Sequence, residues 1–249
     1  MSKQVIYAIG LGPGAADLLT PRAARAIAQC DVIAGYNAYL KQFPELFNGK
    51  KIIGNGMRGE IERCNLALKE AACGKTVGVI SSGDAGIYAM AGLLLELVNA
   101  EGMDIEVVSI PGVTAASAAA CILGAPLMND FAVISLSDLL TPRQIIVKRL
   151  KAVAAGDMVC ALYNPSSTRR KSLIREAVEI FMEAHGGDCY CGIVKDASRP
   201  GETATVCQLC NFPFDSIDMT TIVITGNSQT LFENGKLFTK RGYIEKYGK

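Results

Sequence analysis

The sequence has no tryptophan, a single histidine and almost no net charge. Its 249 residues include 25 Lys and Arg against 24 Asp and Glu, which leaves a formal charge of +1. This balance gives no whole-chain electrostatic reason to expect a nucleic acid, an anionic membrane or an acidic partner. The one histidine, His185, precedes Gly186-Gly187 at the end of a predicted helix. That position favours a C-terminal capping role over a catalytic one.

Long hydrophobic runs are also missing. The apolar run at residues 5–10 is too short for the core of a signal peptide, so we expect no export and a cytoplasmic protein. Residues 107–129 carry no charge and have the length of a membrane span. Pro111 and Pro126 reduce the helix-compatible part to about 14 residues, however, which favours a buried helix of a soluble domain.

Nine cysteines in a chain expected to meet a reducing cytosol indicate mostly free thiols. Cys189, Cys191, Cys207 and Cys210 could supply four thiolates to a metal, but their spacing lacks the paired C-x-x-C pattern of a zinc ribbon. We therefore interpret them as small core residues and predict no metal site.

Short apolar runs alternate with helical patterns along most of the chain. Strands are predicted at 4–10, 31–35, 76–81, 105–110, 131–136, 157–163, 189–195 and 220–225, and helices at 20–30, 58–73, 87–98, 113–123, 142–154 and 168–185. Strands separated by such helices require right-handed crossovers and mainly parallel sheets. The segment GAPLMND is the best boundary, so we predict two α/β domains, 1–123 and 124–249, with ligands in a cleft between them.

The loop Gly10-Leu11-Gly12-Pro13-Gly14-Ala15 matches the spacing of a dinucleotide fingerprint. Its surroundings do not fit that motif. The helix start signal, Thr20 as N-cap before Pro21, comes too late, and Asp31 stands at the start of the second strand instead of closing it. Pro13 also removes a backbone donor where an anion would need one. We predict a tight, non-helical loop that a ligand can approach closely, with a nucleotide-dependent oxidoreductase as the alternative from another class.

Three further loops follow predicted strands at their carboxyl ends, at residues 81–88, 111–115 and 163–165. Ligands of open α/β sheets bind at this edge. Glycine and proline that merely turn strands into helices would explain any one of these loops, but the four loops together indicate a ligand site.

The charge is unevenly distributed along the chain. Between Asp138 and Arg175 there are eight cations and two anions, a local charge of +6, so the other residues carry −5. A nucleic-acid-binding surface is one interpretation, but Tyr163 is the only aromatic residue in this stretch, which leaves few stacking platforms for bases.

Several segments together resemble one known family. GLGPGAADLLTPRA, SSGDAGIYAMAG and IPGVTAASAAACILGAPL resemble, in order and spacing, the N-terminal signatures of the tetrapyrrole (corrin and porphyrin) methylases. ISLSDLLTP, ALYNPSSTRR, GIVKDASRPGE and TIVITGNSQT are similar to one branch of that family, the precorrin-3B or cobalt-factor III C17-methyltransferases of cobalamin biosynthesis. The resemblance extends from Val5 to about Tyr243.

The resemblance implies a homodimer whose two α/β domains bind S-adenosylmethionine in the interdomain cleft and release S-adenosylhomocysteine. By motif position it implies cofactor contacts from Pro13, Gly83, Asp84, Ile87, Thr114, Ala115, Tyr163 and Asn164. One departure is Ala85, which stands where many relatives have proline. Another precorrin, uroporphyrinogen III, ribosomal RNA or a modified protein histidine remain alternative substrates within the superfamily.

The implied reaction moves a methyl group to a macrocycle carbon and is coupled to ring contraction. Positioning and water exclusion can supply much of such a barrier without a metal or a covalent nucleophile. Asp138 is the candidate acid/base, with a helix N-cap as its alternative role. Candidates for binding the substrate carboxylates are Arg143, Arg169, Arg170 and Lys171, whereas Lys148 and Lys151 are interpreted as a solvated helix face.

Overall fold

The computed structural model describes residues 4–166 and 172–248. Its contacts group the chain into two compact units, Met1–Ala115 and Ala116–Lys249, each built of helices and strands. The predicted α/β fold class is therefore confirmed. The division assigns nearly all of α5 (Ala115–Leu123) to the second unit, whereas the boundary expected from the sequence follows this helix.

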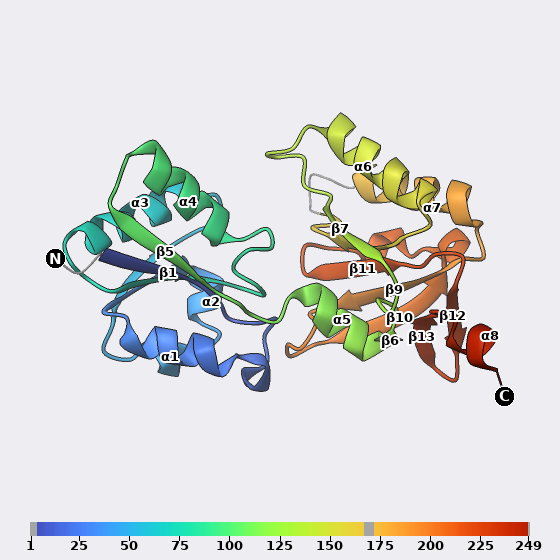
Figure 1. The fold of residues 1–249 in the computed structure, drawn as a ribbon, viewed down its shortest axis with the longest axis horizontal. Coiled ribbons are helices and arrows are strands. Elements are labelled where there is room, and N and C mark those ends of the chain that lie inside the picture. The colour runs from blue at the N-terminus through green and yellow to red at the C-terminus, as the bar shows by residue number, and fades with distance from the viewer. Residues whose placement is uncertain (1–3, 167–171, 249) are drawn as a thin grey trace. The chain divides into compact units, whose positions relative to one another are not determined.

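The first unit is a five-stranded parallel sheet with the order β3-β2-β4-β1-β5 (Figure 1). Its strands are β1 (Gln4–Gly10), β2 (Val32–Tyr36), β3 (Lys51–Asn55), β4 (Val77–Ser81) and β5 (Ile105–Ile110). Its helices are α1 (Pro21–Gln29), α2 (Asn37–Leu40), α3 (Glu60–Ala72) and α4 (Met90–Ala100), with short 3-10 turns η1 (Ala16–Leu18) and η2 (Pro44–Phe47). The mainly parallel sheet expected from the sequence is thus found in this unit.

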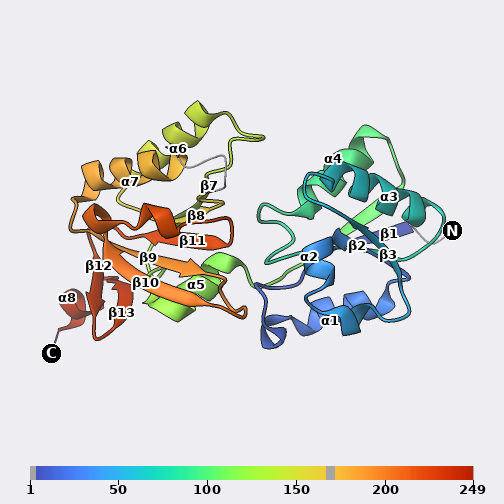
Figure 2. The same cartoon turned by 180° about the vertical axis from the view of Figure 1, so that it is seen from behind.

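Both faces of this sheet are covered, as a parallel sheet requires. Ile6 of β1 packs with α3 and α4 on one face. Ile9, three residues further along the strand, points to the opposite face and packs with α1. Figures 1 and 2 show the helices on these opposite faces. Helix α1 begins as predicted, because the Thr20 hydroxyl oxygen accepts a hydrogen bond from Ala23 N at 3.1 Å and Pro21 occupies the first turn.

The second unit contains a five-stranded sheet with the order β10-β9-β11-β8-β7. Its strands are β7 (Phe131–Ser135), β8 (Val159–Tyr163), β9 (Tyr190–Lys195), β10 (Thr203–Gln208) and β11 (Thr221–Thr225). Only β7 and β8 are parallel, and the other three pairings are antiparallel. The prediction of a mainly parallel sheet is wrong here, because β9 and β10 form a hairpin and no crossover helix leads into β11.

Two layers cover this second sheet. Helices α6 (Arg143–Ala155) and α7 (Ser172–His185) pack on one face, with the 3-10 turns η3 (Leu209–Asn211) and η4 (Phe214–Ser216) following β10. On the other face Gly192 lies against Leu123 of α5 and Leu237, and a Cβ at this glycine would press on both leucine side chains. Leu237 belongs to a small sheet of β6 (Gly124–Ala125), β12 (Thr230–Glu233) and β13 (Lys236–Thr239), and α8 (Tyr243–Tyr247) follows it.

The β12–β13 hairpin was not predicted, although its turn has a sequence typical of hairpins. Asn234 and Gly235 connect the strands, and both have positive φ, 51° and 73°. An Asn-Gly pair between two short apolar strands is typical of a type I′ turn. The segment TLFENGKLFT therefore contained the information that predicts this hairpin.

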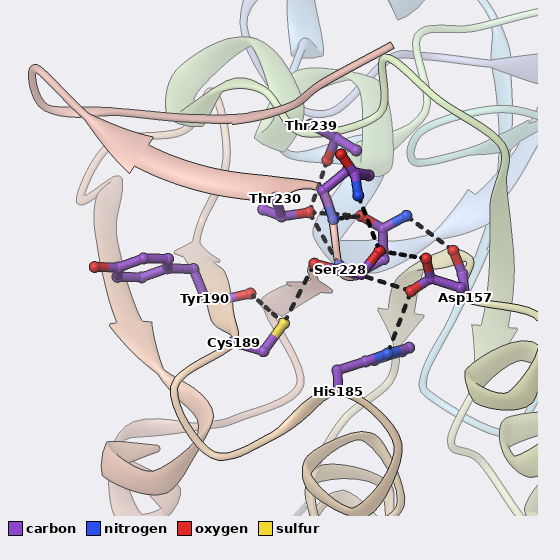
Figure 3. Close-up of polar contacts among 9 residues, drawn as sticks. Asp157, His185, Cys189, Tyr190, Ser228, Thr230 and Thr239 are labelled. Carbon is purple, nitrogen blue, oxygen red and sulfur yellow. Dashed lines mark hydrogen bonds and ion pairs between the residues drawn. The ribbon is translucent and has the colours of Figure 1, made fainter. Parts of the chain in front are cut away.

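A polar network ties the start of this hairpin to the turn before β8 (Figure 3). Both Asp157 carboxylate oxygens accept from Ser228, from its backbone N at 2.9 Å and its hydroxyl at 2.5 Å. Asn227 donates from Nδ2 to the Asp157 carbonyl at 2.8 Å, and Thr230 and Thr239 join their hydroxyls at 2.8 Å. The GNSQT segment therefore has a structural role in joining the small sheet to the rest of its unit.

His185 ends α7 but does not cap it, contrary to the expectation from its position. Its side chain is only 4% exposed and its Nδ1 lies 3.3 Å from Asp157 Oδ1 (Figure 3). The imidazole stacks on Phe181 of the same helix, and its Nε2 is buried without a hydrogen-bond partner. Gly186, with φ of 88°, takes the left-handed position after the helix instead.

Burial lowers the pKa of His185 below 6.5, and the Asp157 carboxylate opposes this only in part. The unfolded chain therefore binds a proton more readily, so the neutral imidazole contributes stability that is present above about pH 6.5 and is lost as the pH falls toward the folded-state pKa. We expect the unfolding free energy to decrease in that window, and His185→Phe to flatten the decrease.

Because the chain has one histidine, a proton NMR titration reports its pKa directly. A measured pKa at or above 6.5 in the folded protein would contradict this prediction. Urea unfolding at about pH 5.5 and about pH 7.5 completes the test, with His185→Gln as the variant that keeps a donor toward Asp157.

Candidate functional site

Three loops of the first unit meet at the carboxyl ends of β1, β4 and β5. Gly12 N donates to Gly83 O at 3.0 Å, Gly83 N returns a bond to Gly12 O at 2.7 Å, and Leu11 N donates to Ser81 O at 2.9 Å. Gly12 and Gly83 have φ of 80° and 69°, a conformation that glycine adopts without steric cost. The first two loops are therefore fastened to each other by backbone.

The first loop is non-helical, as predicted. A short 3-10 turn follows it, and α1 starts only at Pro21, so α1 does not begin inside the glycine loop. Pro13 is buried. A dinucleotide fingerprint of the usual kind, with the helix beginning inside the loop, is not what this segment forms.

Gly10 lies where three backbones converge. A Cβ at this position would stand 2.6 Å from Gly83 O, 2.8 Å from Gly112 N and 3.0 Å from Ala85 N. All three neighbours are backbone atoms, which cannot rotate away. In the sequence this glycine is only part of a motif, and its packing role follows from the meeting of three strand ends.

Asp84 connects the second loop to the third. Its Oδ1 accepts from Gly86 N at 2.8 Å and its Oδ2 from Gly112 N at 3.0 Å. The carboxylate was expected to face a ligand, and in the structure each oxygen also holds loop backbone. Each oxygen retains a second lone pair for a further donor.

The third loop is anchored from the other side by Thr20. Its hydroxyl donates to Pro111 O at 3.2 Å while its oxygen caps α1. Thr114 and Ala115 are half-buried beside Gly83, and Ile87 is 36% exposed in the turn before α4. The structure therefore brings the predicted residues of the first unit to one edge of its sheet.

The second unit carries its predicted pair, Tyr163 and Asn164, at the end of β8. Asn164, with φ of 52°, donates from Nδ2 to the Ser135 hydroxyl at 2.9 Å, and that hydroxyl also accepts from Ser137 N at 3.2 Å. Ser135 ends the parallel neighbour β7, so it links the two strand ends. Ser135 and Asn164 are 29 residues apart in the chain, and no sequence motif predicted their hydrogen bond.

The Tyr163 hydroxyl accepts a hydrogen bond from Ala116 N at 2.9 Å, in the first turn of α5. Tyr163→Phe leaves this partly buried N–H without that acceptor, so we expect the unfolding free energy to fall by about 1 kcal/mol. Thermal unfolding of the variant measures the change. An unchanged midpoint would show that water replaces the hydroxyl there.

Asp138 lies exposed in the turn after β7. The alternative role considered for it, a helix N-cap, is wrong, because α6 begins at Arg143 with Pro142 in the cap position and has no side-chain cap. The next residues, Leu139 and Leu140, are 64% and 98% exposed. An acidic group therefore stands beside an exposed apolar pair at the end of β7.

Arg143 is bound to its own unit. Its guanidinium donates to Glu176 Oε2 at 2.5 Å and to the Ser172 hydroxyl at 2.8 Å, both on α7. The other basic candidates, Arg169, Arg170 and Lys171, lie outside the described residues. Lys148 and Lys151 are exposed on α6, as interpreted from the sequence.

All nine cysteines are free thiols in the structure. Over residues 4–166 and 172–248, no cluster of three or more His, Cys, Asp and Glu side chains is arranged to hold a metal ion. In the same ranges no helix has the length and apolar character needed to cross a membrane.

Comparison with known proteins identifies the family. The family model of the tetrapyrrole (corrin/porphyrin) methylases matches residues 5–212. The chain belongs to this family. This tetrapyrrole methylase is 43% identical over 239 residues to a probable cobalt-factor III C(17)-methyltransferase of Salmonella typhimurium, a match that covers 96% of the chain and 99% of the relative.

A second relative and a solved structure are also similar to the methylase. It is 44% identical over 246 residues to the cobalamin biosynthesis protein CbiHC of Archaeoglobus fulgidus; the match covers 99% of the chain but only 54% of that relative, so the methylase spans about half of its length. The crystal structure of the methyltransferase CobJ superposes with a TM-score of 0.90 at 36% identity, covering 96% of this chain and all of the other.

Proposed function

We propose that this methylase transfers a methyl group from S-adenosylmethionine to C17 of precorrin-3B or cobalt-factor III, coupled to ring contraction, in cobalamin biosynthesis. The observation that carries the proposal is the near end-to-end similarity to the Salmonella relative, supported by the fold shared with CobJ. The downstream segments, among them ISLSDLLTP and GIVKDASRPGE, are the ones that resemble this branch rather than other family members.

The proposed cofactor contacts are Pro13, Gly83, Asp84, Ile87, Thr114 and Ala115 in the first unit, and Tyr163 and Asn164 in the second. The Asp84 carboxylate suits such a ligand, because each of its oxygens retains a lone pair beside the one that holds a loop amide. The cofactor, when bound, supplies a methyl group on a positively charged sulfur. The fixed loops would orient it without rearranging, which is how positioning lowers a displacement barrier.

For the substrate, we propose that Asp138 acts as acid/base or orienting group and that Arg143, Arg169, Arg170 and Lys171 bind its carboxylates. Arg143 uses two of its five N–H donors on α7, so donors remain for a carboxylate. The exposed Leu139 and Leu140 offer apolar surface to a macrocycle beside Asp138. We further propose that the enzyme is a cytoplasmic homodimer.

Anaerobic incubation with S-adenosylmethionine and either cobalt-factor III or precorrin-3B, followed by mass spectrometry, tests the proposal. We expect one of the two substrates to gain a single methyl group, and none without the methyl donor. Absence of the gain with both substrates, together with methylation of uroporphyrinogen III or another precorrin, would assign the chain to another branch. Reduction of a nicotinamide cofactor without methyl transfer would support the oxidoreductase alternative.

A further inference from the structure

Two cysteines face each other across the hairpin of the second sheet. Cys191 of β9 is directly opposite Cys207 of β10 in the antiparallel register, and their sulfur atoms are 3.4 Å apart. Leu209 N donates to Cys189 O, which makes Leu209 and Cys189 a hydrogen-bonded pair of the antiparallel ladder. Such pairs recur at every second position, so Cys207 and Cys191 are also a hydrogen-bonded pair. Such pairs have Cα atoms about 5.5 Å apart, inside the range of about 4.4–6.8 Å that a disulfide spans.

The environments of the two thiols differ. Cys191 has no exposed surface, whereas Cys207 is half-buried on β10, an edge strand whose residues 203–205 are exposed. The hydrogen bond with Cys207, reinforced by burial, raises the pKa of Cys191. The same hydrogen bond lowers the pKa of Cys207. The hydrogen bond therefore favours the proton on the buried sulfur, and Cys207 is the more readily deprotonated of the two thiols.

The neighbouring cysteines are placed differently. The Cys189 sulfur lies 3.7 Å from the carbonyl oxygens of Tyr190 and Asn227 (Figure 3), and Cys210 is exposed beyond the end of β10. Cys191 and Cys207, in contrast, have their sulfur atoms in direct contact. Proximity therefore selects one pairing from four candidate thiols in this part of the chain.

We propose that Cys191 and Cys207 form a reversible disulfide site that reacts with small disulfides such as oxidised glutathione. The Cys207 thiolate attacks one sulfur of the oxidant, forming a mixed disulfide and releasing one thiolate. Cys191 then loses its proton to solvent and attacks the Cys207 sulfur, which expels the second thiolate. Two protein thiols are oxidised and one small disulfide is reduced to two thiols, so atoms and electrons balance.

Oxidation would link β10 to β9 covalently and make residues 191–207, including the connection at 196–202, one closed loop. Only the last step of approach is missing, since the sulfur atoms must move from 3.4 Å to the bonding distance of about 2.0 Å. The site lies in a segment that contains none of the proposed cofactor or substrate residues, so it is separate from the proposed methyl transfer.

The test is titration of the full chain with glutathione at increasing oxidised-to-reduced ratios, acid quenching, alkylation of remaining thiols and peptide mass spectrometry. We expect a cross-linked peptide containing Cys191 and Cys207, which disappears on addition of dithiothreitol. Cys210→Ser, a change at an exposed thiol of the same segment, should leave the cross-link intact. Full alkylation of both cysteines at the most oxidising ratio would overturn the proposal.

The order of attack gives a second test. In Cys191→Ala the mixed disulfide has no resolving thiol, so glutathione should accumulate on Cys207, whereas in Cys207→Ser the buried Cys191 should stay unmodified. Circular dichroism checks that each variant is folded, and the wild-type titration decides the proposal if one is not. Glutathione on Cys191 in the folded Cys207→Ser variant would contradict the assigned roles.

Discussion

Asp84→Ala is expected to weaken S-adenosylmethionine binding by at least about 100-fold, which corresponds to about 2.7 kcal/mol. The substitution removes the acceptor of both Gly86 N and Gly112 N, and hydrogen bonds to a charged group contribute about 1.5–3 kcal/mol each. The second and third loops would lose their connection at the edge of the sheet where the cofactor is proposed to bind. Isothermal titration calorimetry measures the effect.

Asp84→Asn separates geometry from charge. Asparagine keeps one acceptor oxygen, so it can hold one of the two loop amides but not both. We expect its affinity to lie between those of the wild type and the alanine variant. If Asp84→Ala bound the cofactor as tightly as the wild type, the proposed site on these loops would be wrong.

Gly10→Ala is expected to produce the largest loss of stability, about 3 kcal/mol, or roughly 6–12 °C in Tm. The new Cβ would press on Gly83 O, Gly112 N and Ala85 N, so the backbones of two loops would have to move. Because the same loops form the proposed cofactor site, cofactor affinity should fall together with Tm. Differential scanning fluorimetry with and without S-adenosylmethionine measures both.

Gly92→Ala is the matched control. Gly92 lies exposed in α4, and a Cβ there meets no atom within 4 Å. Alanine in place of a helical glycine should raise the unfolding free energy by about 0.5–1 kcal/mol. Equal losses in the two alanine variants would show that close backbone packing is not the cause.

Local signals were sufficient for much of the first unit. Thr20-Pro21 predicted the start of α1, and continuous apolar runs bounded by glycine predicted buried parallel strands such as β4. Parallel strands joined by helices have their carboxyl ends at one edge of the sheet, so the gathering of the glycine loops at that edge followed from the pattern of strands and helices. Helix α4 begins at Met90, three residues after the predicted start at Ile87, because the turn with Tyr88 at φ of 52° comes before it.

The second unit shows where local pattern stops being informative. The run at 220–225 reads as a buried strand in either direction, because alternation and apolarity do not record whether a neighbour is parallel or antiparallel. Only the hairpin between β9 and β10 and the insertion of β11 between β9 and β8 decide that most of this sheet is antiparallel.

The α/β class, the glycine loops at strand ends and the family could be recognised from the sequence, since they depend on residues that are neighbours in the chain. The three-dimensional structure was needed to show that Asp84 binds the amide of Gly112 in the third loop, that Arg143 pairs with Glu176 and that Cys191 lies against Cys207. Each of these contacts joins residues from different loops, helices or strands. Which side chains meet across such elements is set by packing and register, and spacing along the chain does not encode it.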